Sequence, residues 1–281
     1  RPIKKILRGT PAVDGAGVHL TRVIGHADIR DVDPFLMLDA FDSANPDDYV
    51  RGFPWHPHRG IETITYLIEG DIEHGDSLGN KGSIKDGDCQ WMTAGSGIIH
   101  QEMPVASSRM FGAQIWLNLP AKDKMTTPAY GDIRHEDIPT VTRAGVRVKV
   151  IAGEYEGVSG AFTGAYVPAT YLDVDLVSGS TFQTPVASGL TAFAYLFSGE
   201  GHIGAHEDSV KEKHAVLFGD GDAVLVRAGE SGARFILLFA PPLREPIAWG
   251  GPIVMNTQGE LAQAFRELDE GTFIKNGAVK G

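Results

Sequence analysis

The feature that most limits the fold of this chain is a weak internal repeat. Three pairs of similar segments make up the repeat: YLIEGDIEHGD from Tyr66 with YLFSGEGHIGAHED from Tyr195, KDGDCQWMTAG from Lys85 with GDGDAVLVRAG from Gly219, and FGAQIWLNLP from Phe111 with SGARFILLFAPP from Ser231. A repeat of this kind indicates that one supersecondary arrangement occurs twice. The chain is therefore expected to contain two copies of one fold.

Each copy alternates short apolar strands with Gly-rich turns. The 281 residues include 35 Gly and 16 Pro, which is typical of a turn-rich chain. Short strands at regular spacing with turn signals predict an antiparallel sandwich or barrel. We therefore predict an all-β protein with two tandem β-barrels, over residues 1–130 and 131–281. The boundary falls in the polar stretch from Ala121 to Pro139, which shows neither a helical nor a strand period.

One helix is predicted near the end of the chain. Thr257 can cap it, and Glu260, three positions on, can return the bond as in a capping box. Four apolar residues then follow at helical spacing, which predicts a face that packs on a barrel: Leu261, Ala264, Phe265 and Leu268.

Two histidine-containing stretches carry the candidate chemistry. HPHRGIE contains His56, His58 and Glu62, which share a face if the strand is unbroken, and GIIHQEMP contains His100 and Glu102 at the same alternating spacing. A single His-x-His in a strand is as well explained by ordinary hydrogen bonding as by metal binding. The second pair favours coordination, because a glutamate is seldom inside a barrel unless it is paired or bound to a cation.

The repeat provides an internal control for this interpretation. Carrying the spacing of the first copy onto the second places three residues at the positions of His56, His58 and Glu62: Pro185, Ala187 and Thr191. The second copy also lacks a counterpart of the insert from Gly95 to Gly112, which carries the second pair of candidate ligands. A metal is therefore expected in the first barrel only.

Other candidate groups are weaker. His202 and His206 lie four positions apart in a Gly- and acid-rich segment that we expect to be a loop, so a second metal site is not predicted there. The one cysteine, Cys89, cannot form an intramolecular disulfide and is expected to be a small core residue.

Charge and hydropathy exclude several classes of function. The net charge is -11, and the one basic cluster is KKILR near the start, so direct nucleic-acid binding is not expected. No apolar run is long enough for a membrane helix, and no signal segment opens the chain. A cytoplasmic protein is expected, with a nuclear location as the alternative if the source is eukaryotic.

Three stretches together resemble the pirin family of the cupin superfamily: HPHRGIETITYLIEGDIEH, GDCQWMTAGSGIIHQEMP and PLREPIAWGGPIVMNT. The resemblance implies two cupin, or jelly-roll, barrels, with iron in the N-terminal one only. It implies metal ligands at His56, His58, His100 and Glu102. The general cupin pattern would instead place Glu62 on the metal, so Glu62 is retained as an alternative ligand or as a partner of a ligand.

The resemblance implies two classes of activity. Some pirins have quercetin 2,3-dioxygenase activity, which predicts a metal-dependent dioxygenase that acts on a flavonol-like substrate, with Glu102 or Glu62 as the base. Three imidazoles and a carboxylate suit Fe2+, or another divalent first-row metal, and leave open coordination positions. The alternative is a redox-sensitive regulatory protein without turnover, which binds transcription factors or metabolic enzymes.

Overall fold

The computed structural model describes residues 1–205 and 208–275, which fall into two compact units. The unit that we call the first barrel is formed by Pro11–His26, Phe35–His135 and the described part of Leu243–Gly281. The second barrel is formed by Arg1–Thr10, Ala27–Pro34 and Glu136–Pro242. This grouping differs from the contiguous division at residue 130, because Arg1–Thr10 and Ala27–Pro34 belong to the second barrel and the C-terminal segment belongs to the first.

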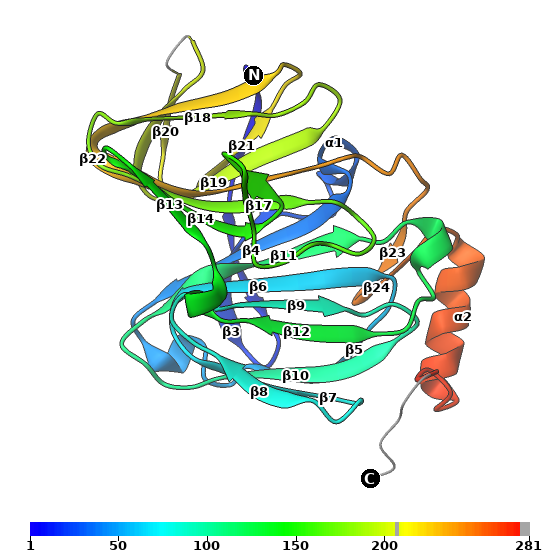
Figure 1. Cartoon of the computed structure of the whole chain (residues 1–281). Coiled ribbons are helices and arrows are strands. Elements are labelled where there is room, and N and C mark those ends of the chain that lie inside the picture. Colours follow the sequence, from blue (N-terminus) through cyan, green and yellow to red (C-terminus); the bar gives the residue numbers. More distant parts are fainter. Residues whose placement is uncertain (206–207, 276–281) are drawn as a thin grey trace. The chain divides into compact units, whose positions relative to one another are not determined.

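The first barrel consists of a seven-stranded and a four-stranded sheet (Figure 1). The larger sheet runs in the order β12 (Ala129–Ile133), β9 (Cys89–Thr93), β6 (Ile61–Glu69), β11 (Met110–Asn118), β4 (Phe35–Ser43), β3 (Val18–Ile24) and β2 (Thr10–Asp14). The smaller sheet runs in the order β5 (Phe53–His58), β10 (Ile98–Pro104), β7 (Ile72–Asp76) and β8 (Lys81–Ile84).

Sequence explains the position of β5 at the edge of the smaller sheet. Pro54 and Pro57 lack an N–H group, and an edge strand can tolerate them because one of its sides forms no ladder. The chain then leaves this sheet at Gly60, whose φ of +77° lies in the left-handed region that glycine adopts readily. β6 therefore starts in the other sheet, and β5 and β6 are not one continuous strand.

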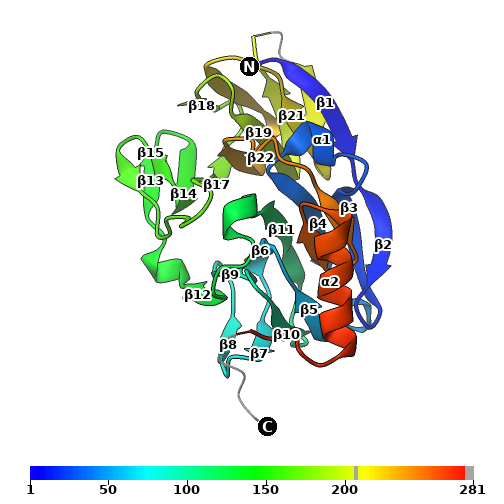
Figure 2. The ribbon, with the colours of Figure 1, turned by 90° about the vertical axis from the view of Figure 1, so that its right-hand side faces the viewer.

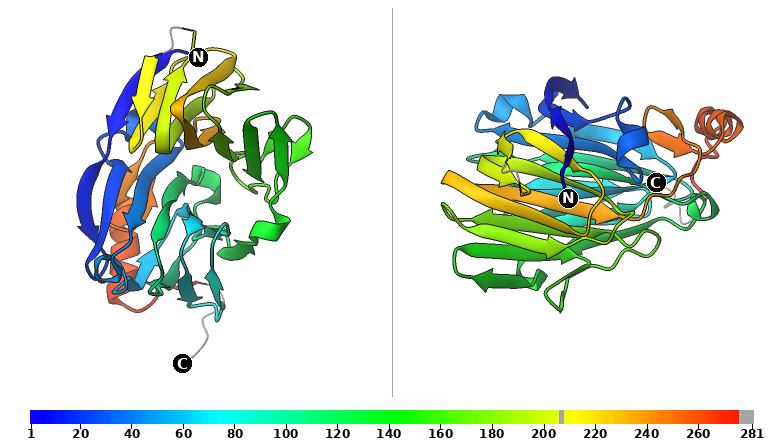
Figure 3. Two further views of the ribbon diagram at one scale, coloured as in Figure 1. Left: turned by 90° about the vertical axis from the view of Figure 1, so that its left-hand side faces the viewer. Right: turned by 90° about the horizontal axis from the view of Figure 1, so that it is seen from above.

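The second barrel contains one strongly bent nine-stranded sheet (Figures 2 and 3). Its strands are β1 (Ile3–Arg8), β13 (Thr140–Arg143), β14 (Val146–Ala152), β17 (Thr170–Leu176), β18 (Thr181–Pro185), β19 (Thr191–Ile203), β20 (Asp208–Lys211), β21 (His214–Phe218) and β22 (Ala223–Ala240). β1 pairs with β21, as Figure 2 shows. A small hairpin, β15 (Glu154–Tyr155) and β16 (Val158–Ser159), belongs to the same unit.

Short helical elements complete the two units. They are α1 (Ile29–Val32) in the second barrel, the 3-10 turns η1 (Pro46–Asp48) and η2 (Ala121–Asp123) in the first, and η3 (His135–Asp137) where the chain passes between the units.

Strand pairing confirms the repeat but changes its register. The order β6-β11-β4-β3 recurs as β19-β22-β17-β14. β9 pairs with β6 as β21 pairs with β19, so β21 is the counterpart of β9. The first half of β22 pairs with β18 and with the end of β19, and is therefore the counterpart of β10. The sequence alignment of residues 85–95 with 219–229 was wrong, because it matched two Gly-Asp turns at different places in the fold.

The insert from Gly95 to Gly112 thus does have a structural counterpart. It is the first half of β22, whose inward positions Val224, Val226 and Ala228 belong to the apolar core of the second barrel. Phe182 of β18, the counterpart of β5, packs in the same core. The second barrel therefore presents apolar side chains on the strands that carry histidines in the first.

The C-terminal segment belongs to the first barrel. It contains β23 (Ala248–Gly250), β24 (Ile253–Met255) and the helix α2 (Gln258–Asp269). The predicted capping box is present, with Thr257 and Glu260 bonding reciprocally. Leu261 and Ala264 are buried as predicted, but Phe265 is 40% exposed, so it is only partly covered.

Further outcomes concern the polar stretch, the remaining histidines and the cysteine. The stretch predicted to be irregular contains β12, which pairs with β9. His202 lies in β19 rather than in a loop, and His206 lies outside the described residues. Cys89 is buried as expected, and burial raises the pKa of its thiol. Within the described residues, no helix is both long and apolar enough to span a membrane.

Candidate metal centre

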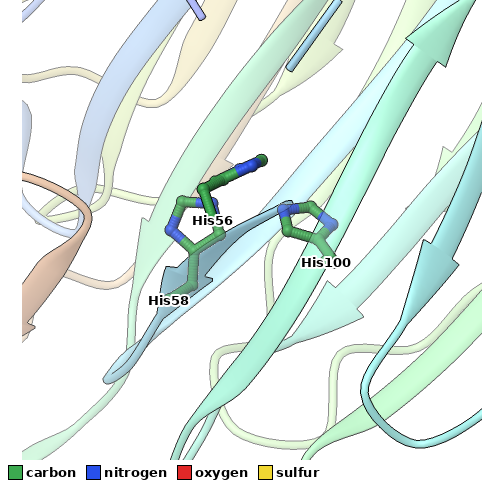
Figure 4. A group of neighbouring side chains, drawn as sticks. All are labelled: His56, His58 and His100. Carbon is green, nitrogen blue, oxygen red and sulfur yellow. The ribbon is translucent and has the colours of Figure 1, made fainter. Parts of the chain in front are cut away.

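Three histidines converge inside the first barrel (Figure 4). His56 and His58 are two positions apart on β5, and His100 of β10 lies opposite His56 in the strand register. One ligand nitrogen from each ring lies within 4.8 Å of the other two. The ring centroids are 4.4 Å apart for His56 and His100 and 5.0 Å apart for His58 and His100. The alternating strand geometry brings the three imidazoles to one point.

Hydrogen bonds define which nitrogens can act as ligands. His56 Nδ1 is 2.8 Å from the Pro54 carbonyl oxygen, and His58 Nδ1 is 3.1 Å from the Pro252 carbonyl oxygen. Because a carbonyl only accepts, each Nδ1 must carry the proton and donate it. A neutral ring then has an unprotonated Nε2. His100 Nε2 is buried and has no hydrogen-bond partner.

Burial keeps two of these rings neutral. Desolvation, with a smaller contribution from His56, lowers the pKa of His58 to about 3. Desolvation and then the neighbouring histidines hold the pKa of His100 well below its ordinary value. Neutral imidazole is the form that binds metal. Three imidazole nitrogens at one point, one of them otherwise unpartnered, fit a divalent first-row metal.

Glu102 lies near these rings but outside the three-histidine group. It is buried and follows His100 by two residues on β10, so both side chains point to the same side of the strand. Gln114 donates to its Oε1 and Oε2 at 2.9 and 3.0 Å, and Thr65 donates to Oε1 at 3.2 Å. This network fixes the orientation of the carboxylate. Its role as a fourth ligand stays a prediction.

Glu62 lies on the opposite face of the larger sheet. Thr65 of β6 faces Glu102, to which it donates a hydrogen bond. Side chains alternate along a strand, and Glu62 precedes Thr65 by an odd number of residues, so Glu62 and Thr65 point to different sides of the sheet. Thr93 donates to Glu62 Oε1 at 2.7 Å, and burial raises the pKa of Glu62. The unbroken strand that would have placed Glu62 beside His56 and His58 does not exist, because Gly60 ends it. The geometry does not favour Glu62 as a ligand or base.

A pocket of about 660 Å³ opens beside the histidines. His56, His58 and Glu102 contribute to its wall. The other lining residues include aromatic and polar groups that the sequence did not indicate: Arg22, His26, Asp39, Phe53, Trp55, Gln114, Trp116 and Trp249. Strand alternation on β4 and β11 could have suggested Asp39 and Gln114, but nothing in their spacing marks them as functional.

An ion pair forms the polar part of this wall. Arg22 donates to both oxygens of Asp39, at 2.9 and 2.7 Å, and to Asp14 at 2.8 Å. Burial raises the pKa of Asp39, and the Arg22 guanidinium opposes this shift. Both carboxylates retain lone pairs that can accept hydrogen bonds from a ligand.

The fold and this site define a bicupin, with two jelly-roll barrels and a candidate metal centre in the first barrel alone among the described residues. The chain belongs to the pirin family. The family model for pirin matches residues 17–117, and that for the pirin C-terminal cupin domain matches residues 171–274.

Individual relatives agree with this assignment. A pirin-like protein of Caulobacter vibrioides is 45% identical over 97% of this chain and 99% of its own length. A Pseudomonas aeruginosa protein provisionally named a quercetin 2,3-dioxygenase is 44% identical over 96% of this chain and 97% of its own. The crystal structure of quercetin 2,3-dioxygenase from Acinetobacter baumannii has a TM-score of 0.87 and 32% identity, covering 96% of this chain and 97% of its own.

Proposed function

We propose that this protein is an iron-dependent flavonol 2,3-dioxygenase, which opens the central ring of a quercetin-like flavonol with O2. The observation that carries the proposal is the convergence of three imidazole nitrogens beside an aromatic pocket that also contains the fixed carboxylate of Glu102. The names of the Pseudomonas and Acinetobacter relatives support the same reaction.

The pocket suits a planar, hydroxylated aromatic ligand. The indoles of Trp55, Trp116 and Trp249 lie in its wall, and Trp55 is 54% exposed, so its ring can be reached from solvent. Aromatic faces of this kind stack on flat ring systems. The carboxylates of Asp14 and Asp39 can accept hydrogen bonds from phenolic hydroxyl groups. A flavonol presents both features.

Glu102 is the group that we assign as the base. Its Oε1 accepts bonds from both Thr65 and Gln114, whereas Oε2 accepts one bond, from Gln114. Oε2 therefore has the greater free capacity to accept the proton of the flavonol 3-hydroxyl. Gln114 holds the carboxylate in place while the proton moves. A divalent metal held by His56, His58 and His100 would supply Lewis acidity to the hydroxyl and ketone oxygens of the substrate.

The test is an aerobic assay of protein whose metal content has been measured by mass spectrometry. Quercetin should be consumed with equal amounts of O2 taken up and carbon monoxide released, at a rate above that of free iron at the same concentration. Iron, rather than another first-row metal, should restore this rate in protein stripped with chelator. A fully metal-loaded sample without turnover on several flavonols would overturn the proposal and favour the non-catalytic regulatory role.

A further inference from the structure

The C-terminal segment contributes a tight hairpin to the metal centre, far along the chain from the histidines. β23 and β24 pair antiparallel, with Gly250 opposite Ile253, so Gly251 and Pro252 form the two-residue turn. Gly251 has a φ of +53°, in the region that favours glycine at the first position of such a turn. This turn places the Pro252 carbonyl oxygen 3.1 Å from His58 Nδ1.

Two buried basic side chains and a backbone hydrogen bond fasten the hairpin to the loop that follows His58. Lys124 is buried, and its Nζ donates to Val254 O at 2.9 Å and to Gly60 O at 2.8 Å. The backbone N–H of Val254 donates to Arg59 O at 3.1 Å. The Arg59 guanidinium in turn donates to Phe273 O at 2.8 Å. The hairpin is therefore fixed on the same backbone that carries His58.

Ring contacts connect the hairpin to His58 from a second direction. The Trp249 ring lies 5.7 Å from that of Trp116, and the Trp116 ring meets His58 edge-on at 5.1 Å. Trp249 also stacks on His26 at 5.0 Å and donates its indole N–H to Gly251 O at 2.8 Å. The imidazole of His58 thus has a hydrogen-bond acceptor on one side and an aromatic wall on the other.

We propose that the β23–β24 hairpin is a positioning element of the metal centre, which acts through the Pro252 carbonyl. This carbonyl holds the proton of neutral His58 on Nδ1. The Nε2 lone pair therefore stays available to a metal held by the three histidines. Without the acceptor, the neutral ring populates both tautomers, and the Nε2–H form cannot bind a metal through Nε2. The inference rests on the proposed metal site, but the tautomer can be measured without metal.

The first measurement is the protonation of the His58 nitrogens in metal-free wild-type protein, by 15N–1H correlation of the imidazole. Nδ1 should carry the proton. Observation of Nε2–H as the main tautomer would overturn the inference whether or not the protein binds metal. Failure of wild type to bind any metal, with the Nδ1–H tautomer present, would instead count against the proposed function.

The second measurement uses Gly251→Ala, which strains the turn and displaces the Pro252 carbonyl. The dissociation constant for Fe2+, measured anaerobically on folded protein, should rise by about 10- to 100-fold. Gly179→Ala is the matched control: its φ is +73°, its Cβ also meets nothing within 4 Å, and it lies in the second barrel. Equal iron affinity and equal His58 tautomer in the two variants would contradict the positioning role.

Discussion

On β5 and β10 of the first barrel, the directly opposed residues are His56 and His100. On the matching strands of the second barrel, the opposed residues are Phe182 and Val226, both in the apolar core. The same strand arrangement thus forms a pocket lined with polar groups in the first barrel and a packed apolar core in the second. The difference teaches that the candidate chemistry depends on a few inward positions rather than on the barrel itself.

The two interiors are expected to contribute differently to stability. Each fully buried apolar side chain of the second barrel contributes roughly 1.5–3 kcal/mol. In the first barrel, buried polar groups require hydrogen-bond partners, which Pro252 provides for His58 and Gln114 provides for Glu102. Substitutions at matched positions can therefore separate binding from folding.

The largest expected effect is loss of metal from His100→Ala. Removing one of three converging imidazoles should abolish stoichiometric metal binding and the proposed turnover, because the remaining pair offers only two nitrogen ligands. Val226→Ala, on the strand of the second barrel that corresponds to β10, should leave the metal content unchanged. Full metal occupancy in His100→Ala, measured by mass spectrometry after dialysis, would refute the assignment of the site.

The two glutamates of the first barrel give the next comparison. Glu102→Gln should lower kcat for quercetin by about 10²- to 10⁴-fold, the usual range for loss of a general base. Glu62→Gln is the matched control, since its side chain lies on the other face of the sheet and bonds to Thr93. Steady-state kinetics on metal-loaded protein will measure kcat for both variants and so test this prediction. A larger loss in Glu62→Gln than in Glu102→Gln would reverse the roles.

In the second barrel, Phe235→Ala should reduce the free energy of unfolding by about 3–5 kcal/mol, through a large core cavity. Phe235 is fully buried and contacts Phe182 edge-on, with ring centroids 5.7 Å apart. Folded variant protein should keep the metal affinity of wild type. Urea unfolding and metal titration provide the two measurements, and a parallel loss of affinity would show that the two interiors are coupled.

The smallest effect concerns the stability of metal-free protein in acid. His58 has a folded pKa of about 3 and an ordinary value of 6.5. The unfolded chain therefore binds a proton below pH 6.5 that the folded chain does not, and stability should fall by about 1.4 kcal/mol for each pH unit as pH falls from 6.5 toward 3. Unfolding at several pH values should show a weaker dependence in His58→Gln but not in His214→Gln, a variant in the second barrel.

Local patterns in the sequence predicted much of this architecture. The strand pattern with Gly turns predicted two β units, Thr257 and Glu260 predicted the helix start, and His-x-His with a distant His predicted the three-imidazole cluster. These features depend on neighbours in sequence or on simple alternation. They can be recognised without knowledge of tertiary contacts.

The remaining features depend on long-range geometry. Glu62 was misplaced because a single glycine, Gly60, moves the chain from one sheet to the other. The partner of His58 is a backbone carbonyl 194 positions away. Every residue has a backbone carbonyl, so no residue type in the sequence marks this one. The Arg22–Asp39 pair likewise becomes visible only when β3 and β4 are side by side.

The exchange of end segments has a consequence for synthesis on the ribosome. The histidines of β5 and β10 leave the exit tunnel long before the C-terminal segment does. That segment contains Pro252, whose carbonyl bonds to His58, and Val254, whose carbonyl accepts from Lys124. Chains grow at about 5–20 residues per second, and domains usually fold as they emerge. Here the first barrel acquires its last part only after nearly all of the second barrel has been made. Under the proposed function, a nascent chain would present an incomplete centre to the cell's metal pool for several seconds, so we expect translation speed to influence metal loading.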